Sequence, residues 1–359
     1  MVYKFNNFST SIDILQEIPS IKNITGDLNV ITENVLIIAD ENTLSIAEKI
    51  RGSEKIPFCL LKSGEENKTW QSVESILAAA KNANLGRDAV FLGVGGGVLL
   101  DLCGFAASIY KRGCRLAFVS TTLLAMVDAS VGGKTGFDLF GIKNIIGTFY
   151  PASAVYMPLD SLKTLPEKEW KNGFAELIKT AVLAGGDFFE QIVNNKEQIS
   201  GNSDFRLPEQ YIKKAVEYKA SVVSEDLYET GKRTLLNLGH TFAHALESTA
   251  GLGQIPHGAA VAWGMVRACE LGAALGITPP QRADKIKDLI SFFDYETSCP
   301  YPEAYDTESM LSAINNDKKN KNKKITFIVP DNDSACPVIL ETEDDMKLLK
   351  KILSGRIND

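Results

Sequence analysis

Short apolar runs alternate with amphipathic stretches through the first half of this chain. Residues 34–40 (NVLIIAD), 56–64 (IPFCLLKSG) and 88–97 (DAVFLGVGGG) have the composition of buried strands, and each precedes a segment with apolar residues at helical spacing. Residues 114–128 (CRLAFVSTTLLAMVD) supply a further strand, which we expect to end at Thr121 and Thr122. This alternation predicts a mostly parallel sheet with helices on both faces. Ligands of such sheets bind beyond the carboxyl ends of the strands.

The sequence pattern changes near residue 165, from alternating strand-like and helix-like segments to mostly helix-like ones. Thr164 precedes Pro166, and Glu167 and Glu169 follow in what would be the first turn of a helix. Most segments after this point are typical of helices separated by Gly or Pro, except residues 324–330 (KITFIVP), which predict a short strand. We therefore expect an α/β, Rossmann-like nucleotide-binding domain over residues 1–165 and an all-α domain over residues 166–359.

The composition excludes several classes of protein. The net charge of −7 and the pI near 5.3 argue against a nucleic-acid partner, because nucleic-acid-binding domains are usually basic. No run approaches the roughly 18 apolar residues of a membrane span, and the first ten residues lack an apolar signal core. Six scattered cysteines form no CxxC pair, which favours reduced thiols and a cytoplasmic location.

A run of glycines follows the third apolar run. The segment LGVGGGVLLD fails the dinucleotide fingerprint G-x-G-x-x-G because Val98 stands at the last glycine position. Glycines after a strand can bring backbone N–H groups to a pyrophosphate, but they can equally make a tight strand-to-helix turn. Upstream, Glu65 and Lys68 offer a carboxylate and an ammonium three residues apart.

Residues 120–138 (STTLLAMVDASVGGKTGFD) combine hydroxyls, a carboxylate, two glycines and a lysine. Lys143 and Asn144 follow shortly after. Such groups at strand ends are what phosphate or polyol binding requires, and no Walker motif is present. Because the polar residues alternate with apolar ones that must be buried, a simple surface loop is the less favoured interpretation.

All three histidines lie within eighteen consecutive positions. His240 and His244 are four residues apart and share one helix face, and a turn through Gly251, Gly253 and Pro256 can return His257 to it. With Glu176 they predict a divalent metal site that keeps one position open, although HExxH is absent. The spacing leaves open which two histidines bind the metal and which one handles protons.

Six segments together carry a resemblance to a known family. They are residues 95–113, 120–136, 143–147, 164–179, 229–247 and 257–265. In this order they resemble 3-dehydroquinate synthase, and the match runs from about residue 60 to 320. The resemblance implies a dehydroquinate synthase-like fold and a homodimer with catalytic NAD and zinc, or cobalt in its place. The implied substrate is the sugar phosphate 3-deoxy-D-arabino-heptulosonate 7-phosphate, which the family converts to 3-dehydroquinate and phosphate.

The resemblance also implies roles for individual residues. It assigns the metal to Glu176, His240 and His257, and leaves His244 for the phosphate end of the substrate. Arg112 matches an arginine that reaches the neighbouring subunit's site, and Lys318, with Lys319 as the alternative, matches a phosphate-binding lysine. The implied dinucleotide contacts are Asp40, Glu65, Lys68, Gly96, Gly97, Asp101, Thr121, Thr122, Lys143 and Thr164. The implied substrate contacts are Asp128, Lys134, Asn144, Lys179, Lys219, Glu229, Arg233 and Asn237.

Some positions depart from the family pattern. Leu100 and Ile142 stand where glycines are usual near the cofactor, and the other departures are Leu227, Ala243 and Ala259. Two rival interpretations share the scaffold. One is a sugar phosphate cyclase acting on sedoheptulose 7-phosphate or glucose 6-phosphate. Those acting on sedoheptulose 7-phosphate typically lack the second histidine of GHTFxH, whereas His244 is present here. A polyol dehydrogenase of glycerol dehydrogenase type would release NADH stoichiometrically and would not need a cluster of phosphate-binding cations.

Overall fold

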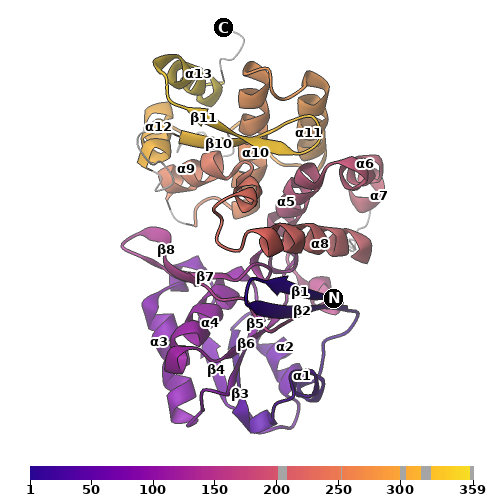
Figure 1. The fold of residues 1–359 in the computed structure, drawn as a ribbon, viewed down its shortest axis with the longest axis vertical. Helices are drawn as coiled ribbons and strands as arrows, with labels where there is room; N and C mark the ends of the chain where they lie inside the picture. The colour runs from indigo at the N-terminus through magenta and orange to yellow at the C-terminus, as the bar shows by residue number, and fades with distance from the viewer. Residues whose placement is uncertain (201–207, 252, 300–304, 317–324, 356–359) are drawn as a thin grey trace. The chain divides into compact units, whose positions relative to one another are not determined.

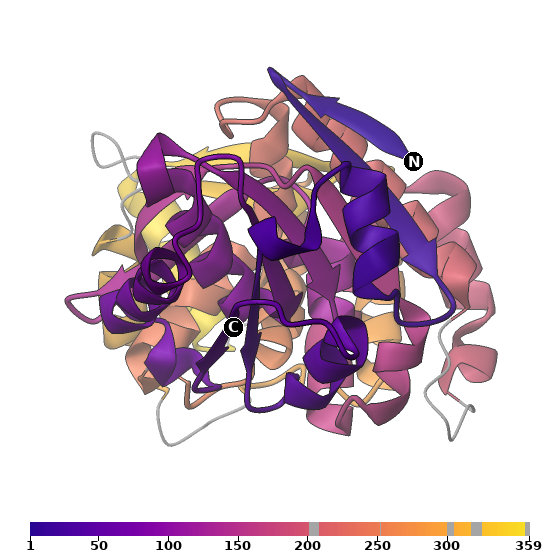
Figure 2. The ribbon, with the colours of Figure 1, turned by 90° about the horizontal axis from the view of Figure 1, so that it is seen from below.

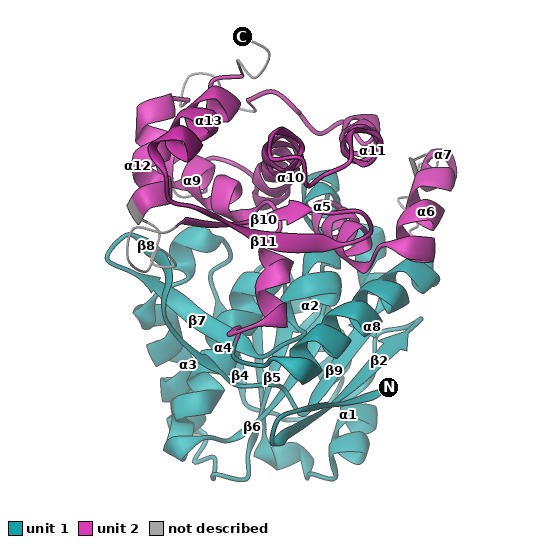
Figure 3. Cartoon of the chain, turned by 45° about the horizontal axis from the view of Figure 1, so that its top comes forward, with its two compact units in different colours: residues 1–173, 208–228 teal, residues 174–207, 229–359 magenta. Residues whose placement is uncertain are grey.

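The computed structural model describes residues 1–200, 208–251, 253–299, 305–316 and 325–355. The chain divides into two compact units. Unit 1 comprises residues 1–173 and 208–228, and unit 2 comprises residues 174–207 and 229–359 (Figure 3). The sequence boundary at 165/166 remains a prediction, and the compact units are instead discontinuous in sequence.

The apolar runs of the first half form the centre of a sheet in unit 1. Within the described residues this sheet has seven strands in the order β1-β2-β9-β6-β5-β3-β4. All its pairs are parallel except β1 with β2. Its strands are β1 (Val2–Phe5), β2 (Phe8–Leu15), β3 (Val35–Asp40), β4 (Phe58–Leu61), β5 (Val90–Gly95), β6 (Arg115–Ser120) and β9 (Ala154–Pro158). The predicted mostly parallel sheet is therefore confirmed, and the β1–β2 hairpin forms one edge (Figure 2).

Helices cover both faces of this sheet, as predicted. Successive side chains of a strand point to opposite faces, so strands that are apolar throughout give the sheet two apolar faces that must be covered. Val35, Ile37 and Ala39 pack with apolar residues of the first two helices. On the opposite face, a Cβ built on Gly93 would lie 3.2 Å from Leu100 Cδ2 and 3.1 Å from the sulfur of Cys103. The helices of unit 1 are α1 (Ile21–Leu28), α2 (Leu44–Arg51), α3 (Trp70–Asn82), α4 (Gly97–Ile109) and α8 (Glu209–Glu225). Figure 1 shows α4 beside the strands of this sheet.

The segment after β6 differs from the prediction. The strand ends at Ser120, before Thr121 and Thr122, and a π-helix occupies Ala125–Ala129. The polar stretch beyond it forms an antiparallel hairpin of β7 (Lys134–Leu139) and β8 (Ile142–Phe149). The hairpin escaped the sequence analysis because its strands contain Gly136 and Gly147, which weaken a strand pattern.

Unit 2 is mainly helical, with one addition. Its described helices, together with α5, which crosses the division between the units, are α5 (Glu167–Ala184), α6 (Gly186–Asn194), α7 (Lys196–Ser200), α9 (His240–Ala250), α10 (His257–Ala274), α11 (Pro280–Phe292), α12 (Thr307–Asn316) and α13 (Glu343–Leu353). The predicted strand is β10 (Ile325–Pro330), and it pairs antiparallel with β11 (Ala335–Leu340). The expectation of an all-α region is thus corrected by this strand pair. No described helix is both long enough and apolar enough to traverse a bilayer.

A close approach of two backbones fixes α9 against α10. Gly239 precedes α9 with φ +78°, and a Cβ there would lie 2.8 Å from the nitrogen of Met265. A Cβ on Gly264, within α10, would lie 2.2 Å from the carbonyl oxygen of Gly239. Both contacts involve backbone atoms, so neither neighbour can rotate away. The two glycines let the start of α9 touch α10.

We therefore expect Gly264→Ala to destabilise the protein by about 1–3 kcal/mol, as other overpacked substitutions do. Gly26→Ala is the matched control, because Gly26 lies exposed in α1 with nothing within 4 Å of a built Cβ. That change should be neutral or stabilise by up to about 1 kcal/mol through helix propensity. Urea unfolding of both variants measures the difference, and equal stabilities would contradict the close approach.

Candidate metal centre and nucleotide crevice

The strand order of unit 1 reverses between two neighbouring parallel strands. From β3 the chain passes to β4 on one side and then to β5 on the other, so the order reverses between β3 and β5. Parallel sheets bind ligands beyond the carboxyl ends of the strands at such a reversal. Asp40 ends β3, and Gly96 and Gly97 follow β5. The topology therefore brings these three predicted dinucleotide contacts to the expected edge.

The glycine run is compatible with both interpretations that the sequence left open, a tight strand-to-helix turn and a backbone site for a pyrophosphate. Gly96 is the N-cap of α4, and a Cβ there would lie 3.1 Å from Thr122 Cγ2. A Cβ on Gly97 would lie 3.3 Å from that of Ala129. The turn is tight, and it also presents the N-terminus of a long helix, where backbone N–H groups attract anions.

Two buried hydroxyls lie beside this helix terminus. Ser120 and Thr121 follow one another at the carboxyl end of β6, and both are buried. Their side-chain oxygens have no hydrogen-bond partner among the described residues. Buried hydroxyls normally find a partner, so these two fit a bound polar ligand. Thr121 was predicted from the resemblance, whereas Ser120 was missed.

Lys68 organises the next group of predicted contacts. Its side chain is buried, and Nζ donates to Asp101 Oδ2 at 2.7 Å and to Asn144 Oδ1 at 2.6 Å. Burial alone would lower the pKa of Lys68, but the carboxylates of Asp101 and Glu65 raise it, so the lysine stays charged. Lys143 lies 3.8 Å from Glu65 in a half-exposed ion pair. Five predicted residues therefore form one polar network.

Asp138 supports this network and was not predicted. Its Oδ1 accepts the backbone N–H of Asn144 at 2.7 Å, and its own N–H donates to the carbonyl of Lys68 at 2.8 Å. Asn144 has φ +51°, a conformation that needs such local support. Because Asp138 makes its contacts through a hairpin that the sequence did not reveal, no simple motif could have identified it.

Other predicted residues of unit 1 have local structural contacts. Asp40 Oδ1 accepts both the N–H and the hydroxyl of Thr43, at 3.0 and 2.9 Å. Thr122 Oγ1 accepts the N–H of Ala125 at 3.1 Å. Thr164 donates to the carbonyl of Ser161 at 3.4 Å. These bonds shape the turns at the carboxyl edge of the sheet and do not by themselves indicate a ligand.

The π-helix is held by a buried lysine from α8. Lys219 Nζ donates to the backbone carbonyl and to Oδ1 of Asp128, at 2.7 and 2.6 Å. π-Helical turns are rare and frequently occur at functional sites. The structure therefore brings together two of the predicted substrate contacts within unit 1. Lys134 and Arg112 are exposed, and Arg112 has φ +67°.

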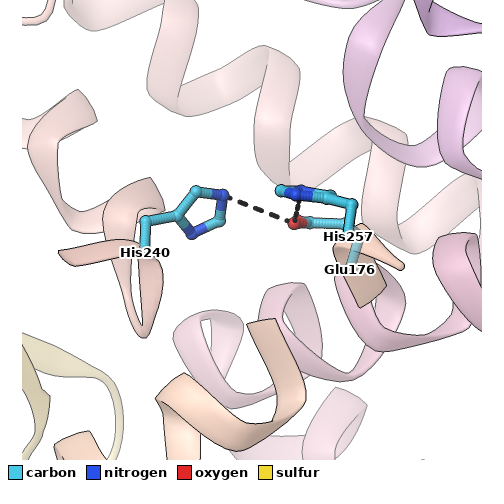
Figure 4. Close-up of side chains that lie close together, drawn as sticks. All are labelled: Glu176, His240 and His257. Carbon is cyan, nitrogen blue, oxygen red and sulfur yellow. Dashed lines mark ion pairs between the residues drawn. The ribbon is translucent and has the colours of Figure 1, made fainter. Parts of the chain in front are cut away.

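Three helices of unit 2 converge on the predicted metal site (Figure 4). Glu176 lies in the middle of α5 with its side chain 1% exposed, while His240 and His257 are the first residues of α9 and α10. Nε2 of His240 lies 3.5 Å from Glu176 Oε1, and Nε2 of His257 lies 3.3 Å from the same oxygen. These three residues form the one candidate metal group found among the described residues.

The spacing fits a divalent cation. Zinc binds imidazole nitrogen and carboxylate oxygen at about 2.0–2.2 Å, so neighbouring ligand atoms of a tetrahedral site lie about 3.4 Å apart. The two measured N···O distances match this edge length. Three side-chain nitrogens, those of Lys179, His240 and His257, lie within ion-pair range of the Glu176 carboxylate. Three N/O ligands leave a fourth position open, as in catalytic zinc sites.

The protonation of the group suits metal binding. Nδ1 of His240 lies 3.2 Å from the carbonyl oxygen of Leu238. When Nδ1–H donates to this oxygen, Nε2 carries the lone pair that faces the metal site. Burial and the Lys179 charge hold the pKa of His240 well below its usual range, so the ring is neutral. Burial would raise the pKa of Glu176, but Lys179 and His257 lower it to about 2, so the carboxylate is ionised.

Without a bound metal ion, His257 is protonated, in contrast to the neutral His240. Burial alone would lower its pKa, but the carboxylates of Glu176 and Glu247 raise it to about 10. A metal ion would replace this proton at Nε2, because a ligating imidazole must be neutral. Without a metal ion, the protonated ring of His257 supplies the positive charge that Glu176 and Glu247 attract.

The remaining candidates of unit 2 lie around or beyond this group. His244 is exposed, and its ring centroid lies 5.4 Å from that of His240. Lys179 is buried and forms an ion pair with Glu176 Oε2. Asn237 donates to Glu229 Oε1 at 2.5 Å, and Arg233 is buried nearby in sequence. Lys318 and Lys319 lie outside the described residues.

Glu247 is a further residue that the sequence analysis missed. Its side chain is buried, and Oε1 lies 3.4 Å from Nδ1 of His257. The available signal was its spacing, because seven residues from His240 is almost two helical turns and therefore the same face. A buried carboxylate on the metal-facing side of α9 could have been expected from that spacing.

Two family models match consecutive parts of the chain. The model of the 3-dehydroquinate synthase N-terminal region matches residues 58–172, and that of the C-terminal region matches residues 173–320. A 3-dehydroquinate synthase of Campylobacter jejuni subsp. doylei is 39% identical over 329 residues, or 91% of each chain. One from Nitratiruptor sp. is 40% identical over 270 residues, or 75% of each chain.

Solved structures share the fold at lower sequence identity. The 2-epi-5-epi-valiolone synthase ValA from Streptomyces hygroscopicus subsp. jinggangensis, with NAD+ and Zn2+ bound, has a TM-score of 0.85, 23% identity and 99% coverage of both chains. A 2-deoxy-scyllo-inosose synthase complexed with carbaglucose-6-phosphate, NAD+ and Co2+ has a TM-score of 0.80, with the same identity and coverage. A probable glycerol dehydrogenase from Sinorhizobium meliloti, covering 99% of this chain and 98% of its own, has a TM-score of 0.67 and 13% identity.

We expect His240→Ala to weaken zinc binding strongly, because it removes one of three protein ligands from the converging group. His244→Ala is the matched control on the same helix, and it should retain the metal. Metal content after dialysis, measured by atomic emission, distinguishes the two variants. Equal retention of zinc would contradict the assignment of ligands.

Lys68→Met should destabilise the protein without NAD by about 3 kcal/mol, because it leaves the Asp101 carboxylate without its buried partner. Lys143→Met removes a half-exposed pair and should change stability by less than about 1 kcal/mol. Chemical unfolding of the two variants measures this difference. Similar losses of unfolding free energy in the two variants would contradict a larger contribution of the buried Lys68–Asp101 pair.

Proposed function

Because the chain belongs to the 3-dehydroquinate synthase family, we propose that it converts 3-deoxy-D-arabino-heptulosonate 7-phosphate to 3-dehydroquinate and phosphate. It is then a carbon–oxygen lyase of the shikimate pathway. The observation that carries this proposal is the convergence of Glu176, His240 and His257, whose ligand atoms lie within 4.8 Å of one another and form a candidate metal centre within one unit.

The proposed cofactors are catalytic NAD and a divalent cation, zinc with cobalt as a substitute. Two structural relatives bind NAD+, one with Zn2+ and one with Co2+. When bound, the cation supplies Lewis acidity at the substrate's hydroxyl groups. Glu176, His240 and His257 would hold it, with His240 already neutral. Lys179 keeps its ammonium against the second oxygen of Glu176, which orients the carboxylate towards the two histidines.

Unit 1 would bind the dinucleotide. Bound NAD would supply reversible hydride transfer, so no net NADH would accumulate. The N-terminus of α4 at Gly96 and Gly97 would receive the pyrophosphate through backbone N–H groups. The Lys68 network and the buried hydroxyls of Ser120 and Thr121 offer further polar partners.

The substrate contacts inferred from the family resemblance remain part of this proposal. Arg233 and His244 of unit 2 would bind near the phosphate, where cationic groups stabilise a departing anion. The contact between Lys219 and Asp128 would hold the π-helix in the shape that presents Asp128. Leu100, a departure from the family pattern, is fully buried and packs against Gly93 of β5, so the strand accommodates it.

We include a homodimer in the cytoplasm in the proposal. Arg112 is exposed in a left-handed conformation, together with Lys111 at φ +48°. The family resemblance gives Arg112 a role across a subunit interface, and light scattering of the purified protein tests the dimer.

The test of the reaction uses purified protein with zinc, the heptulosonate phosphate and NAD below the enzyme concentration. We expect many phosphates released per NAD, formation of 3-dehydroquinate and no lasting rise in absorbance at 340 nm. Protein treated with a chelator should lose the activity and regain it with zinc or cobalt.

Three results would contradict the proposal. One is the absence of phosphate release. Another is a preference for sedoheptulose 7-phosphate, which would indicate a related cyclase. The third is stoichiometric NADH formation from glycerol, which would indicate a polyol dehydrogenase.

A further inference from the structure

His257 lies between two buried carboxylates. Its Nε2 is 3.3 Å from Glu176 Oε1, and its Nδ1 is 3.4 Å from Glu247 Oε1. Glu247 is 5% exposed. A carboxylate so deeply buried needs a compensating partner, because taking its charge out of water is costly. The far nitrogen of a metal-binding histidine is such a partner.

The fold places Glu247 for this contact. His240 and Glu247 are the first and eighth residues of α9, almost two turns apart, so both side chains leave the same face of the helix. One helix thus carries a metal ligand and a carboxylate that contacts another ligand. The close approach of Gly239 and Gly264 fixes α9 against α10, and α10 begins at His257. The geometry is therefore set by rigid elements.

We propose that Glu247 is a positioning residue for the metal centre. It accepts the Nδ1–H of His257, which selects the tautomer with the lone pair on Nε2 and fixes the orientation of the ring. Metal-binding histidines generally donate their other N–H to a carboxylate or carbonyl, and such partners strengthen metal affinity. The carbonyl of Leu238 has the same relation to His240.

The charges of the group agree with this role. Glu176 and Glu247 together carry two negative charges beside a site for a dication, and a ligating His257 would be neutral. Glu247 also lies against the first residue of α10, where the partial positive charge of the helix N-terminus favours an anion. This inference rests on the metal centre of the proposed function and makes no use of the substrate assignment.

The test measures zinc affinity rather than turnover. Apoprotein of the wild type, Glu247→Gln and Glu247→Ala is titrated with zinc against a competing chelator, and the visible spectrum of the cobalt form reports the geometry. We expect Glu247→Ala to bind zinc about 10–100-fold more weakly. Glu247→Gln keeps an oxygen acceptor without the charge, so it should lie between Glu247→Ala and the wild type.

Glu270→Gln provides the matched control. Glu270 is also a largely buried glutamate of unit 2, but its partners are Arg267 and Lys287 rather than a histidine. We expect this variant to bind zinc as the wild type does, even if its apoprotein unfolds more readily. Urea unfolding of each apoprotein separates a general loss of stability from a loss of metal affinity.

Unchanged zinc affinity and cobalt spectrum in folded Glu247→Ala would overturn the proposal. If that variant does not fold, Glu247→Gln decides in the same way. Equal weakening in Glu270→Gln would also overturn it, because the effect would then be general destabilisation. A wild type that does not bind zinc contradicts the metal centre itself, whereas normal zinc binding without phosphate release contradicts the proposed reaction alone.

Discussion

The structure of unit 2 depends on a buried carboxylate that faces two imidazoles. Glu176 lies on a helix surrounded by apolar residues, with its side chain 1% exposed, and it is ionised despite this burial. An ionised group in such surroundings requires positive charge nearby. Lys179 supplies part of that charge on one side. On the other side, the Nε2 atoms of His240 and His257 lie 3.5 and 3.3 Å from Glu176 Oε1, so the buried carboxylate and the two imidazoles form one candidate metal group.

The two units offer different sets of polar groups. Unit 1 offers backbone N–H groups, hydroxyls and a charged network at the carboxyl edge of a parallel sheet, which suits a phosphorylated dinucleotide. Unit 2 offers a nitrogen and oxygen ligand set. Each site is assembled from nearby elements within its own unit, so the coordination of the metal and the packing of the glycine turn can be tested separately.

The sequence predicted the parallel strands and a metal site among the histidines for physical reasons. Central strands are apolar along most of their length, as residues 35–39 of β3 show. Three clustered histidines in an otherwise histidine-free chain favour a functional site. Choosing Glu176, His240 and His257 as ligands required the family resemblance, because helical spacing paired His240 with His244 instead. The structure brings the chosen three together and leaves His244 exposed.

Other features could not be predicted because they depend on contacts distant in sequence. Residues 208–228 belong with unit 1, where Lys219 reaches Asp128 across 91 positions. The β7–β8 hairpin was hidden by its glycines, and the contacts of Asp138 are made through that hairpin. The spacing of Glu247 from His240 is visible in the sequence, but its contact with His257 depends on the packing of α9 against α10.

The most direct measurement of the central claim is anomalous diffraction at the zinc edge from crystals grown with zinc. If Glu176, His240 and His257 hold the metal, one strong anomalous peak lies within about 2.0–2.2 Å of Glu176 Oε1, His240 Nε2 and His257 Nε2. A zinc peak coordinated by other residues, or a well-ordered zinc-saturated crystal without a peak among these three side chains, would contradict that assignment.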